Sequence, residues 1–432
     1  VIGHDQYTVQ INAIAGTGAV TLSNINFDGN SAEDALLRID AGGQVNLTNV
    51  VMEYNPDGKG IFVDNTGAPT PKPVIVKGLD VSNINDGDAV TIYSKGDITV
   101  TNAVVRATIN GWGLVLDNHF GTTAKVTVNT SGVFTNQLTA NQYGGLYVSS
   151  NGNIAVSNTN ASYNASSGAV GLQLDNSSGT GSISLVNITL QSNATQAEIY
   201  TSGGILVDRM TALYGTRGVN LLVQNNLNKP INVYRSTFTQ NGWYGVLVQT
   251  GGIVTLNGVT ALNNQGNNAY GVLVDNSGSG SSIQPVNVLG SYGPNTFNGN
   301  YSGGLKIYSG GKVTVTKVLM QSNNVNGLHI VTTNPLGVVL TDVNIRGTLW
   351  DDGVFIQSTG PVSITRLISM MNGQYGSGNG LTVTTTNANV TIKDSAMTGN
   401  SIYGIETTIG TGVLYLSNTT YFGNYTANIY KN

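Results

Sequence analysis

Few residues of this sequence could do acid/base chemistry, and one pair of neighbouring carboxylates stands out. Asp351 and Asp352 are adjacent in the segment LWDDGVFIQ, directly after Trp350. Acid/base cleavage of a glycosidic bond uses two carboxyl groups about 5 to 10 Å apart. If the chain is an enzyme, Asp351 and Asp352 are therefore its catalytic candidates. The competing interpretation, which the sequence favours, is a solvated corner with no catalytic role.

Another set of aspartates follows short apolar segments and is itself followed by asparagine. Asp-Asn is a turn dipeptide, because both side chains bond to nearby backbone amides. Turns are therefore expected at these positions, in preference to a catalytic cluster. The residues concerned are Asp64, Asp117, Asp175 and Asp275, and Asp40 aligns with them.

The three histidines give no sign of a metal site. His4, His119 and His329 are far apart in the sequence, so we do not expect them to gather around one ion. The GGxGxD nonapeptides that bind calcium in β-rolls do not occur. The sequence therefore predicts no metal ligand and no cofactor.

Aromatic residues recur just ahead of the short apolar segments that begin with glycine. Flat rings offer a large contact area at low entropic cost, and they are typical of sugar-stacking and adhesive surfaces. The alternative is that these rings cover a corner and support loops. The residues that the pattern predicts for binding a glycan or a partner are Trp112, Tyr143, Trp243, Tyr244, Tyr270, Tyr301, Trp350 and Tyr403.

A repeat that runs through the whole sequence must position these residues. Glycine followed by alternating apolar residues recurs with a mean spacing of about 26 residues, as in GLYV at Gly145, GVLV at Gly245 and GLKI at Gly304. This alternation indicates short β-strands, and helical periodicity is almost absent. Each repeat is expected to form three strands. The third tends to end on an Asn, such as Asn164 or Asn264, which suits a tight corner and a ladder of side-chain amides.

Phrases such as NQYGGLYVSSNGNIAVSN, residues 141–158, resemble the repeat of right-handed parallel β-helix proteins, above all large secreted microbial surface proteins and adhesins. The resemblance implies an all-β chain with one domain over residues 1–432, a single-stranded solenoid of about 17 coils of three short strands. The fold hosts lyases, hydrolases, tailspikes and adhesins, so it does not fix the function. Asp351 and Asp352 resemble the paired aspartates of polygalacturonase-like hydrolases, but the GHG and RIK motifs of that family are missing.

Composition narrows the class of partner. Only 9% of the residues are charged and the net charge is -4, so a basic surface for nucleic acid is excluded. No apolar run is long enough for membrane insertion. Cysteine is absent, so disulfides cannot hold the fold together.

These features together predict an extracellular structural or adhesive β-solenoid that is not an enzyme. Its partners would be surface glycans and other copies of itself. A stack of parallel strands leaves unpaired backbone groups at both ends, and head-to-tail pairing there builds a filament. The edges expected to pair contain Val9 and Ile11 on one side and Ala427 and Ile429 on the other. The alternative function is a polysaccharide lyase, hydrolase or tailspike-like depolymerase that acts on acidic or neutral glycans.

Overall fold

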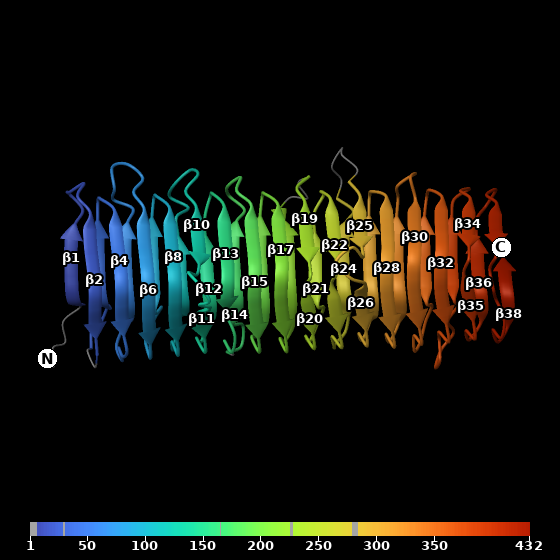
Figure 1. Cartoon of the computed structure of the whole chain (residues 1–432), viewed down its shortest axis with the longest axis horizontal. Coiled ribbons are helices and arrows are strands. Elements are labelled where there is room, and N and C mark those ends of the chain that lie inside the picture. The colour runs from blue at the N-terminus through green and yellow to red at the C-terminus, as the bar shows by residue number, and fades with distance from the viewer. Residues whose placement is uncertain (1–6, 29–30, 165, 225–227, 279–283) are drawn as a thin grey trace. The chain divides into compact units, whose positions relative to one another are not determined.

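The computed structural model describes residues 7–28, 31–164, 166–224, 228–278 and 284–432. They fall into two compact units, unit 1 ending at Thr216 and unit 2 beginning at Arg217. The described residues contain β-strands and no α-helix, and the strands wind into a parallel β-solenoid of about 16 turns (Figure 1), so the predicted fold class is confirmed. In the described part of the chain there is no helix with the length and apolar character needed to cross a membrane.

The strands that carry the glycine motif form the first sheet, sheet A, with every pairing parallel. In unit 1 its strands are β1 (Tyr7–Ala13), β3 (Ala35–Ala41), β5 (Lys59–Asn65), β7 (Val90–Ser94), β9 (Trp112–Asp117), β12 (Gly144–Ser149), β14 (Val170–Asn176) and β16 (Thr195–Thr201). In unit 2 they are β18 (Arg217–Val223), β21 (Val246–Gln249), β24 (Tyr270–Asn276), β27 (Gly303–Ser309), β29 (Asn326–Thr332), β31 (Val354–Ser358), β33 (Leu381–Thr385), β36 (Tyr403–Thr408) and β38 (Ala427–Lys431).

The remaining strands form the second sheet, sheet B, and all of its pairings within a unit are also parallel. In unit 1 its strands are β2 (Val20–Phe27), β4 (Val45–Met52), β6 (Val74–Ser82), β8 (Ile98–Arg106), β10 (Val126–Asn129), β11 (Asn136–Thr139), β13 (Ile154–Asn160), β15 (Ile183–Gln191) and β17 (Ile205–Leu213). In unit 2 they are β19 (Ile231–Tyr234), β20 (Thr237–Thr239), β22 (Val254–Asn257), β23 (Thr260–Leu262), β25 (Val286–Leu289), β26 (Asn295–Asn298), β28 (Val313–Gln321), β30 (Val338–Arg346), β32 (Val362–Met370), β34 (Val390–Lys393), β35 (Ala396–Thr398) and β37 (Leu414–Ser417).

The sequence predicts three strands per coil, but the strands form only two sheets, because two of the three expected strands of each coil lie in sheet B. In many coils the second and third expected strands are one continuous strand that bends at a single left-handed residue, as at Asn49 (φ 53°) in β4 and Asp342 (φ 56°) in β30. Asn and Asp tolerate this conformation better than most residues. Where the corner is longer, as between β10 and β11, the two strands separate.

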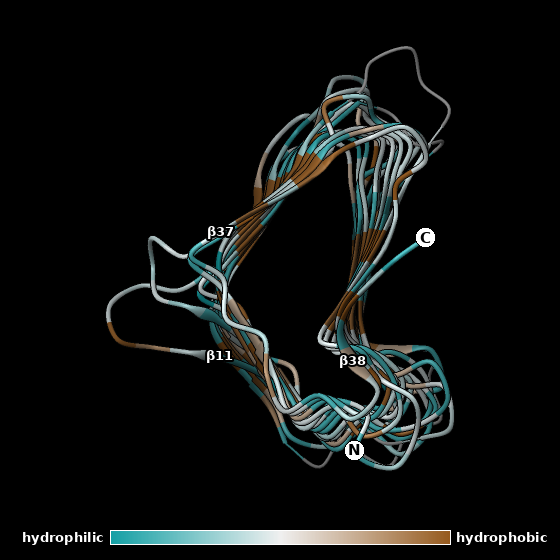
Figure 2. Cartoon of the chain, turned by 90° about the vertical axis from the view of Figure 1, so that its right-hand side faces the viewer, coloured by the Kyte–Doolittle hydropathy of each residue, from teal (hydrophilic) through white to brown (hydrophobic). Residues whose placement is uncertain are grey.

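The core consists of the inward columns that the alternation predicts. Figure 2 shows hydrophobic residues concentrated along the strands and hydrophilic residues at the corners. Leu146 pairs in register with Leu114 and Leu172, and Val246 pairs with Val272. The predicted core residues are all at most 1% exposed, namely Leu146, Val148, Ile154, Val156, Val246, Val248, Val254 and Leu256.

The recurrent asparagines form the predicted ladders. In unit 2 the backbone amide of Asn264 donates to Oδ1 of Asn300 at 3.1 Å, and that of Asn300 donates to Oδ1 of Asn323 at 3.0 Å. The motif glycine lies against this ladder, because a Cβ on Gly271 would stand 2.8 Å from Nδ2 of Asn300, and one on Gly380 would stand 2.6 Å from Nδ2 of Asn400. Glycine and asparagine therefore recur together because a side chain at the glycine would crowd the amide of the asparagine.

The strands expected to mediate assembly each pair with one neighbour in their own unit. Val9 and Ile11 of β1 pair with residues of β3, and Ile429 of β38 pairs with Ile405 of β36. Self-association through Val9, Ile11, Ala427 and Ile429 stays a prediction.

Candidate functional site

The outer face of sheet A in unit 2 carries polar and aromatic side chains that stack in columns. Strand residues alternate between the two sides of a sheet, and parallel strands in register place equivalent residues about 4.8 Å apart. One outward column contains Leu273, Lys306, His329, Phe355, Thr382 and Glu406. A second column, at the start of the same strands, contains Tyr270, Gly303, Asn326, Asp352, Asn379 and Tyr403. We call this surface the unit 2 face.

A hollow of about 660 Å³ opens on the unit 2 face over β24 and β27. Four of its eight lining residues are aromatic and one is a leucine, and two asparagines and one lysine add polar groups. Its lining residues are Trp243, Tyr244, Asn267, Asn268, Tyr270, Leu273, Lys306 and Tyr308. This combination of apolar wall and few polar groups is typical of a ligand-binding site.

Lys306 places a positive charge in this hollow. Its Nζ lies 5.0 Å from the ring centre of Tyr270 and 4.9 Å from that of Tyr308, and it donates a hydrogen bond of 3.3 Å to the Tyr270 hydroxyl. Burial alone would lower the pKa of Lys306, but its interactions with Tyr308 and Tyr270 raise that pKa above the ordinary value, so the group stays charged. No carboxylate in the described part of the chain forms an ion pair with it. The hollow can therefore accept an anionic group.

His329 occupies the next position along the column. Its ring centre lies 4.8 Å from that of Phe355 and 6.5 Å from that of Tyr308. Burial and, to a smaller extent, the charge of Lys306 lower the pKa of His329 to about 4, while the charge of Asp351 opposes the shift. The imidazole is therefore neutral near pH 7 and can donate or accept a hydrogen bond.

Asp352 supplies a buried carboxyl group to the same face. The side chain lies just before β31, and the residue is 5% exposed. Burial, with smaller contributions from the charges of Asp351 and Glu406, raises its pKa to about 7, although hydrogen bonds from Thr382 and from the Asn379 amide oppose the shift. The amide bond to Oδ1 measures 2.7 Å. Near pH 7 a large fraction of Asp352 therefore carries a proton that it can transfer.

Two further carboxylates lie close to Asp352. Oδ1 of Asp351 accepts a hydrogen bond of 2.9 Å from the backbone amide of Asp352. Glu406 is linked through Asn379, whose Nδ2 donates to Oε2 of Glu406 at 2.6 Å and to Oγ1 of Thr382 at 2.9 Å. The sequence interpretation of a solvated corner is therefore wrong for Asp352, because the residues of the two following coils enclose it. It holds in part for Asp351, which is only partly buried.

The Asp-Asn pairs form turns, as the sequence predicts. Oδ1 of Asp64 and of Asp175 each accepts a hydrogen bond of 2.8 Å from the amide two residues ahead, and Oδ1 of Asp275 accepts one of 3.0 Å. Asp40 differs, because it pairs with Nε of Arg38 at 2.9 Å. Asp40 and Asp64 are register partners on the neighbouring strands β3 and β5, and the contacts of each are those of an ion pair or a turn.

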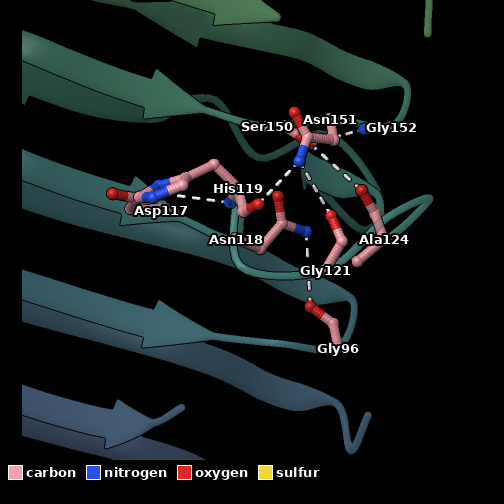
Figure 3. Close-up of polar contacts among 9 residues, drawn as sticks. All are labelled: Gly96, Asp117, Asn118, His119, Gly121, Ala124, Ser150, Asn151 and Gly152. Atoms are coloured by element: carbon pink, nitrogen blue, oxygen red, sulfur yellow. Dashed lines mark hydrogen bonds and ion pairs between the residues drawn. The ribbon is translucent and has the colours of Figure 1, made fainter. Parts of the chain in front are cut away.

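Figure 3 shows the same turn at Asp117. Its Oδ1 accepts a hydrogen bond of 3.1 Å from the amide of His119 and lies 2.5 Å from the Nδ1 atom of that ring. Asn118 points the other way, and its Nδ2 donates to the carbonyl of Gly96 on the preceding coil at 3.3 Å. Asp therefore faces outward and Asn faces the interior of the corner.

The predicted aromatic residues fall into two groups. One group lies in the turns ahead of sheet A and is strongly exposed: Tyr143 (47%), Trp243 (48%), Tyr301 (49%) and Trp350 (53%). The other group lies at or just before the first residue of a sheet A strand and is partly buried: Trp112, Tyr244, Tyr270 and Tyr403. The hollow brings together Trp243, Tyr244 and Tyr270. Binding by any of these rings stays a prediction.

Tyr270 lies flat because the next coil offers it a glycine. A Cβ on Gly303 would stand 2.9 Å from Cε1 and 3.0 Å from Cδ1 of the Tyr270 ring. The sequence signal for this arrangement is an aromatic residue at the start of one glycine motif followed by a double glycine in the next. Sequence reasoning missed it, and it also missed Lys306, Tyr308, Thr382, Asn379 and Glu406. Three of these occupy the variable position in GLKI, GLTV and GIET.

The described residues contain no group of three or more His, Asp or Glu side chains placed to hold a metal ion. His119 and His329 lie in different units, and His4 lies outside the described residues.

No family model and no curated protein matches the chain. Two solved structures are similar to it. The periplasmic alginate epimerase AlgG has a TM-score of 0.29 and 9% identity, over 96% of this chain and 84% of that one. The catalytic unit of the thermostable GH87 alpha-1,3-glucanase from Streptomyces thermodiastaticus strain HF3-3 has a TM-score of 0.26 and 11% identity, over 96% of this chain. This chain spans 64% of that unit, less than two thirds.

The comparison corrects one expectation. The sequence analysis predicts that the chain is not an enzyme, whereas both similar structures are of enzymes, an epimerase and a glucanase.

Proposed function

We propose that the unit 2 face binds a polysaccharide and hydrolyses it. The observation that supports this most directly is a carboxyl group with a pKa of about 7, Asp352, on the same face as an aromatic hollow. A carboxyl that is still protonated near neutral pH can act as a general acid, and a neighbouring ionised carboxylate can act as the base or nucleophile. Elimination would instead need a cation beside the reacting carbon, and Lys306 lies two coils from Asp352.

Each group has a distinct role in this proposal. Asp352 donates its proton to the glycosidic oxygen as the bond breaks. Asp351, the less buried carboxylate, activates the attacking water. Thr382 and Asn379 orient Asp352 through their hydrogen bonds, and they do not touch the sugar.

The hollow holds the polymer on the non-reacting side. The rings of Tyr244 and Tyr270 offer flat surfaces for sugar rings, and Lys306 offers an ammonium group to a sugar carboxylate or sulfate. The neutral imidazole of His329, one coil further on, offers a hydrogen bond to a sugar hydroxyl. Since polymeric glycans of this kind lie outside the cytoplasm, an extracellular location remains part of the proposal.

The test is the release of reducing ends from a panel of neutral and anionic polysaccharides. Asp352→Asn keeps the shape of the side chain but removes the acid, so we expect activity to fall at least about 100-fold. Asp275→Asn, on the same sheet but in a turn, is the matched control and should keep full activity. Full activity in the Asp352 variant, or no product from any polysaccharide with the wild-type chain, would overturn the proposal. Products with an ultraviolet-absorbing unsaturated end would replace hydrolysis by elimination.

A further inference from the structure

We infer that unit 1 carries a second carbohydrate-binding site, without catalysis, in which Trp112 and Tyr147 hold an uncharged glycan. The site lies on the outer face of sheet A over β7, β9, β12 and β14. It goes beyond the proposed function, because it concerns binding by a different unit and needs no reaction.

The two units contain the same arrangement of two successive coils. In unit 2, Tyr270 begins β24 and its ring lies over Gly303 at the start of β27. In unit 1, Trp112 begins β9 and pairs with Gly144 at the start of β12. A Cβ on Gly144 would overlap Cζ3 and Cε3 of the Trp112 ring. The indole therefore lies flat on the sheet, which leaves its other face available to a sugar ring.

Neighbouring groups hold this indole in place. Its backbone amide donates a hydrogen bond of 2.9 Å to Oδ1 of Asp88 on the preceding coil. The ring centre of Tyr147 lies 5.7 Å away at an angle of 59° between the planes. Two rings at this spacing form a bent aromatic surface that is ordered before any ligand arrives, which lowers the entropic cost of binding.

Unused hydrogen-bond acceptors flank the two rings. Asp117 and Asp175 lie on the coils before and after Tyr147, in the adjacent column. Each uses Oδ1 in its own turn, and within the described part of the chain Oδ2 of each accepts no hydrogen bond. Burial raises the pKa of the Tyr147 hydroxyl, and the nearby negative charges of Asp117 and Asp175 add to this shift. Sugar hydroxyls that donate to these oxygens would satisfy them.

The negative charge of the Trp112 site favours an uncharged ligand. The strands β7, β9, β12 and β14 contain neither Lys nor Arg, and Tyr147 stands where Lys306 stands in the corresponding coil of unit 2. An anionic sugar would meet Asp117 and Asp175, and these four strands supply no lysine or arginine to compensate the repulsion. A neutral polysaccharide therefore fits this surface, and a polyuronate does not.

The experiment measures binding in the Asp352→Asn background, so that no polymer is consumed. Affinity gel electrophoresis would use an uncharged α-glucan, an uncharged β-glucan and a polyuronate. We expect at least one neutral glucan to retard the protein. Trp112→Ala should weaken that retardation about three- to tenfold, and Tyr147→Ala should weaken it to a similar or smaller extent. Trp112→Phe should restore part of it.

Two controls separate this site from the rest of the molecule. Tyr54→Ala removes an exposed aromatic residue between β4 and β5 of unit 1 and should change nothing, while Tyr270→Ala should leave the neutral glucan bound by unit 1. Thermal unfolding checks that each variant is folded. Neutral-glucan binding that survives both Trp112→Ala and Tyr147→Ala, or that is absent from the parent protein, overturns the inference. A loss confined to the polyuronate also overturns it. Because the readout is binding, its outcome is independent of whether the unit 2 face hydrolyses anything.

Discussion

The outer faces of sheet A in the two units share one construction and differ in chemistry. Both place a partly buried aromatic ring over a glycine of the next coil, at Trp112 in unit 1 and Tyr270 in unit 2. Unit 1 then presents tyrosines between turn aspartates, whereas unit 2 presents Lys306, His329 and the buried Asp352. The inward columns and the Asn ladders are the same kind in both. The scaffold therefore constrains the side chains that point into the core, while the side chains on the outer face can differ in chemistry between the units.

If the scaffold is equivalent in both units, breaking a ladder should cost the same in each. Asn164→Ala and Asn300→Ala each remove a buried side chain whose Oδ1 accepts from the backbone amide of one neighbouring coil and whose Nδ2 donates to an asparagine of the other. Since several buried donors and acceptors lose partners, we expect each variant to lose about 3 kcal/mol or more of unfolding free energy. Urea unfolding measures this. A cost below about 1 kcal/mol in one unit would show that the ladder matters in the other unit alone.

The pH dependence of stability should differ between the units, and two groups in unit 2 should act in opposite directions. The folded pKa of Asp352, about 7, lies above its ordinary value of 3.8, so its contribution to stability is full below pH 4 and is lost as the pH rises through 7. The folded pKa of His329, about 4, lies below its ordinary value of 6.5, so its contribution is full above pH 6.5 and is lost as the pH falls through 4.

Two variants separate these effects. As the pH rises from 4 to 7, Asp352 lowers and His329 raises the unfolding free energy of wild-type unit 2. Asp352→Asn removes the decrease, so the unfolding free energy of this variant should rise more with pH than that of the wild type. His329→Gln removes the increase, so its unfolding free energy should rise less with pH than that of the wild type. Hydrogen exchange at several pH values, followed by mass spectrometry, reports each unit separately. Identical profiles in the wild-type chain and both variants would contradict the burial of these two groups.

Exchanging one outward residue should exchange the charge preference of the two faces. Lys306→Tyr makes unit 2 resemble unit 1 at the corresponding position, and we expect about a tenfold loss of affinity for a polyuronate, because a charged hydrogen bond is removed. Tyr147→Lys should allow unit 1 to retain the same polymer. Affinity electrophoresis of both variants against neutral and anionic polymers measures the exchange. Unchanged polyuronate affinity in the Lys306 variant would place anion binding elsewhere.

The substitutions expected to change the fold least are those in β1 of unit 1 and β38 of unit 2. Self-association predicts that β1 and β38 pair with strands of other copies, so Val9→Pro and Ile429→Pro, which remove backbone donors, should yield monomers that stay β-rich. Analytical ultracentrifugation and circular dichroism measure these properties. A wild-type chain that remains monomeric at high concentration would exclude the filament.

The sequence was informative wherever a residue's role depends on its own repeat. The inward alternation around Leu146 and Val248, the turns at Asp64 and Asp175, and the ladder through Asn264 all follow from local patterns. One-residue bends were not predicted, because residues such as Asp342 turn the chain without interrupting strand pairing.

The candidate site depends on contacts between coils, and those were harder to infer. The burial of Asp352 comes from Asn379 and Thr382, which are 27 and 30 positions later in the sequence. The hollow around Lys306 needs Trp243 and Tyr270 from two earlier coils. Variable repeat lengths conceal which outward residues become neighbours, and the side-chain directions that enclose a carboxyl are set only when the coils stack.

Because the strands of sheet A pair in register, each coil separates the residues of its two neighbouring coils by the same distance. Lys306, His329 and Phe355 are successive members of one column, so removing the whole coil that carries His329 would bring Phe355 beside Lys306 without changing the direction of any other side chain. Chemical groups on this face can thus move relative to one another only in whole steps of about 4.8 Å. Gain and loss of complete repeats would let a lineage change the distance between its binding hollow and its acid, and so the length of polymer it recognises, while the core stays the same.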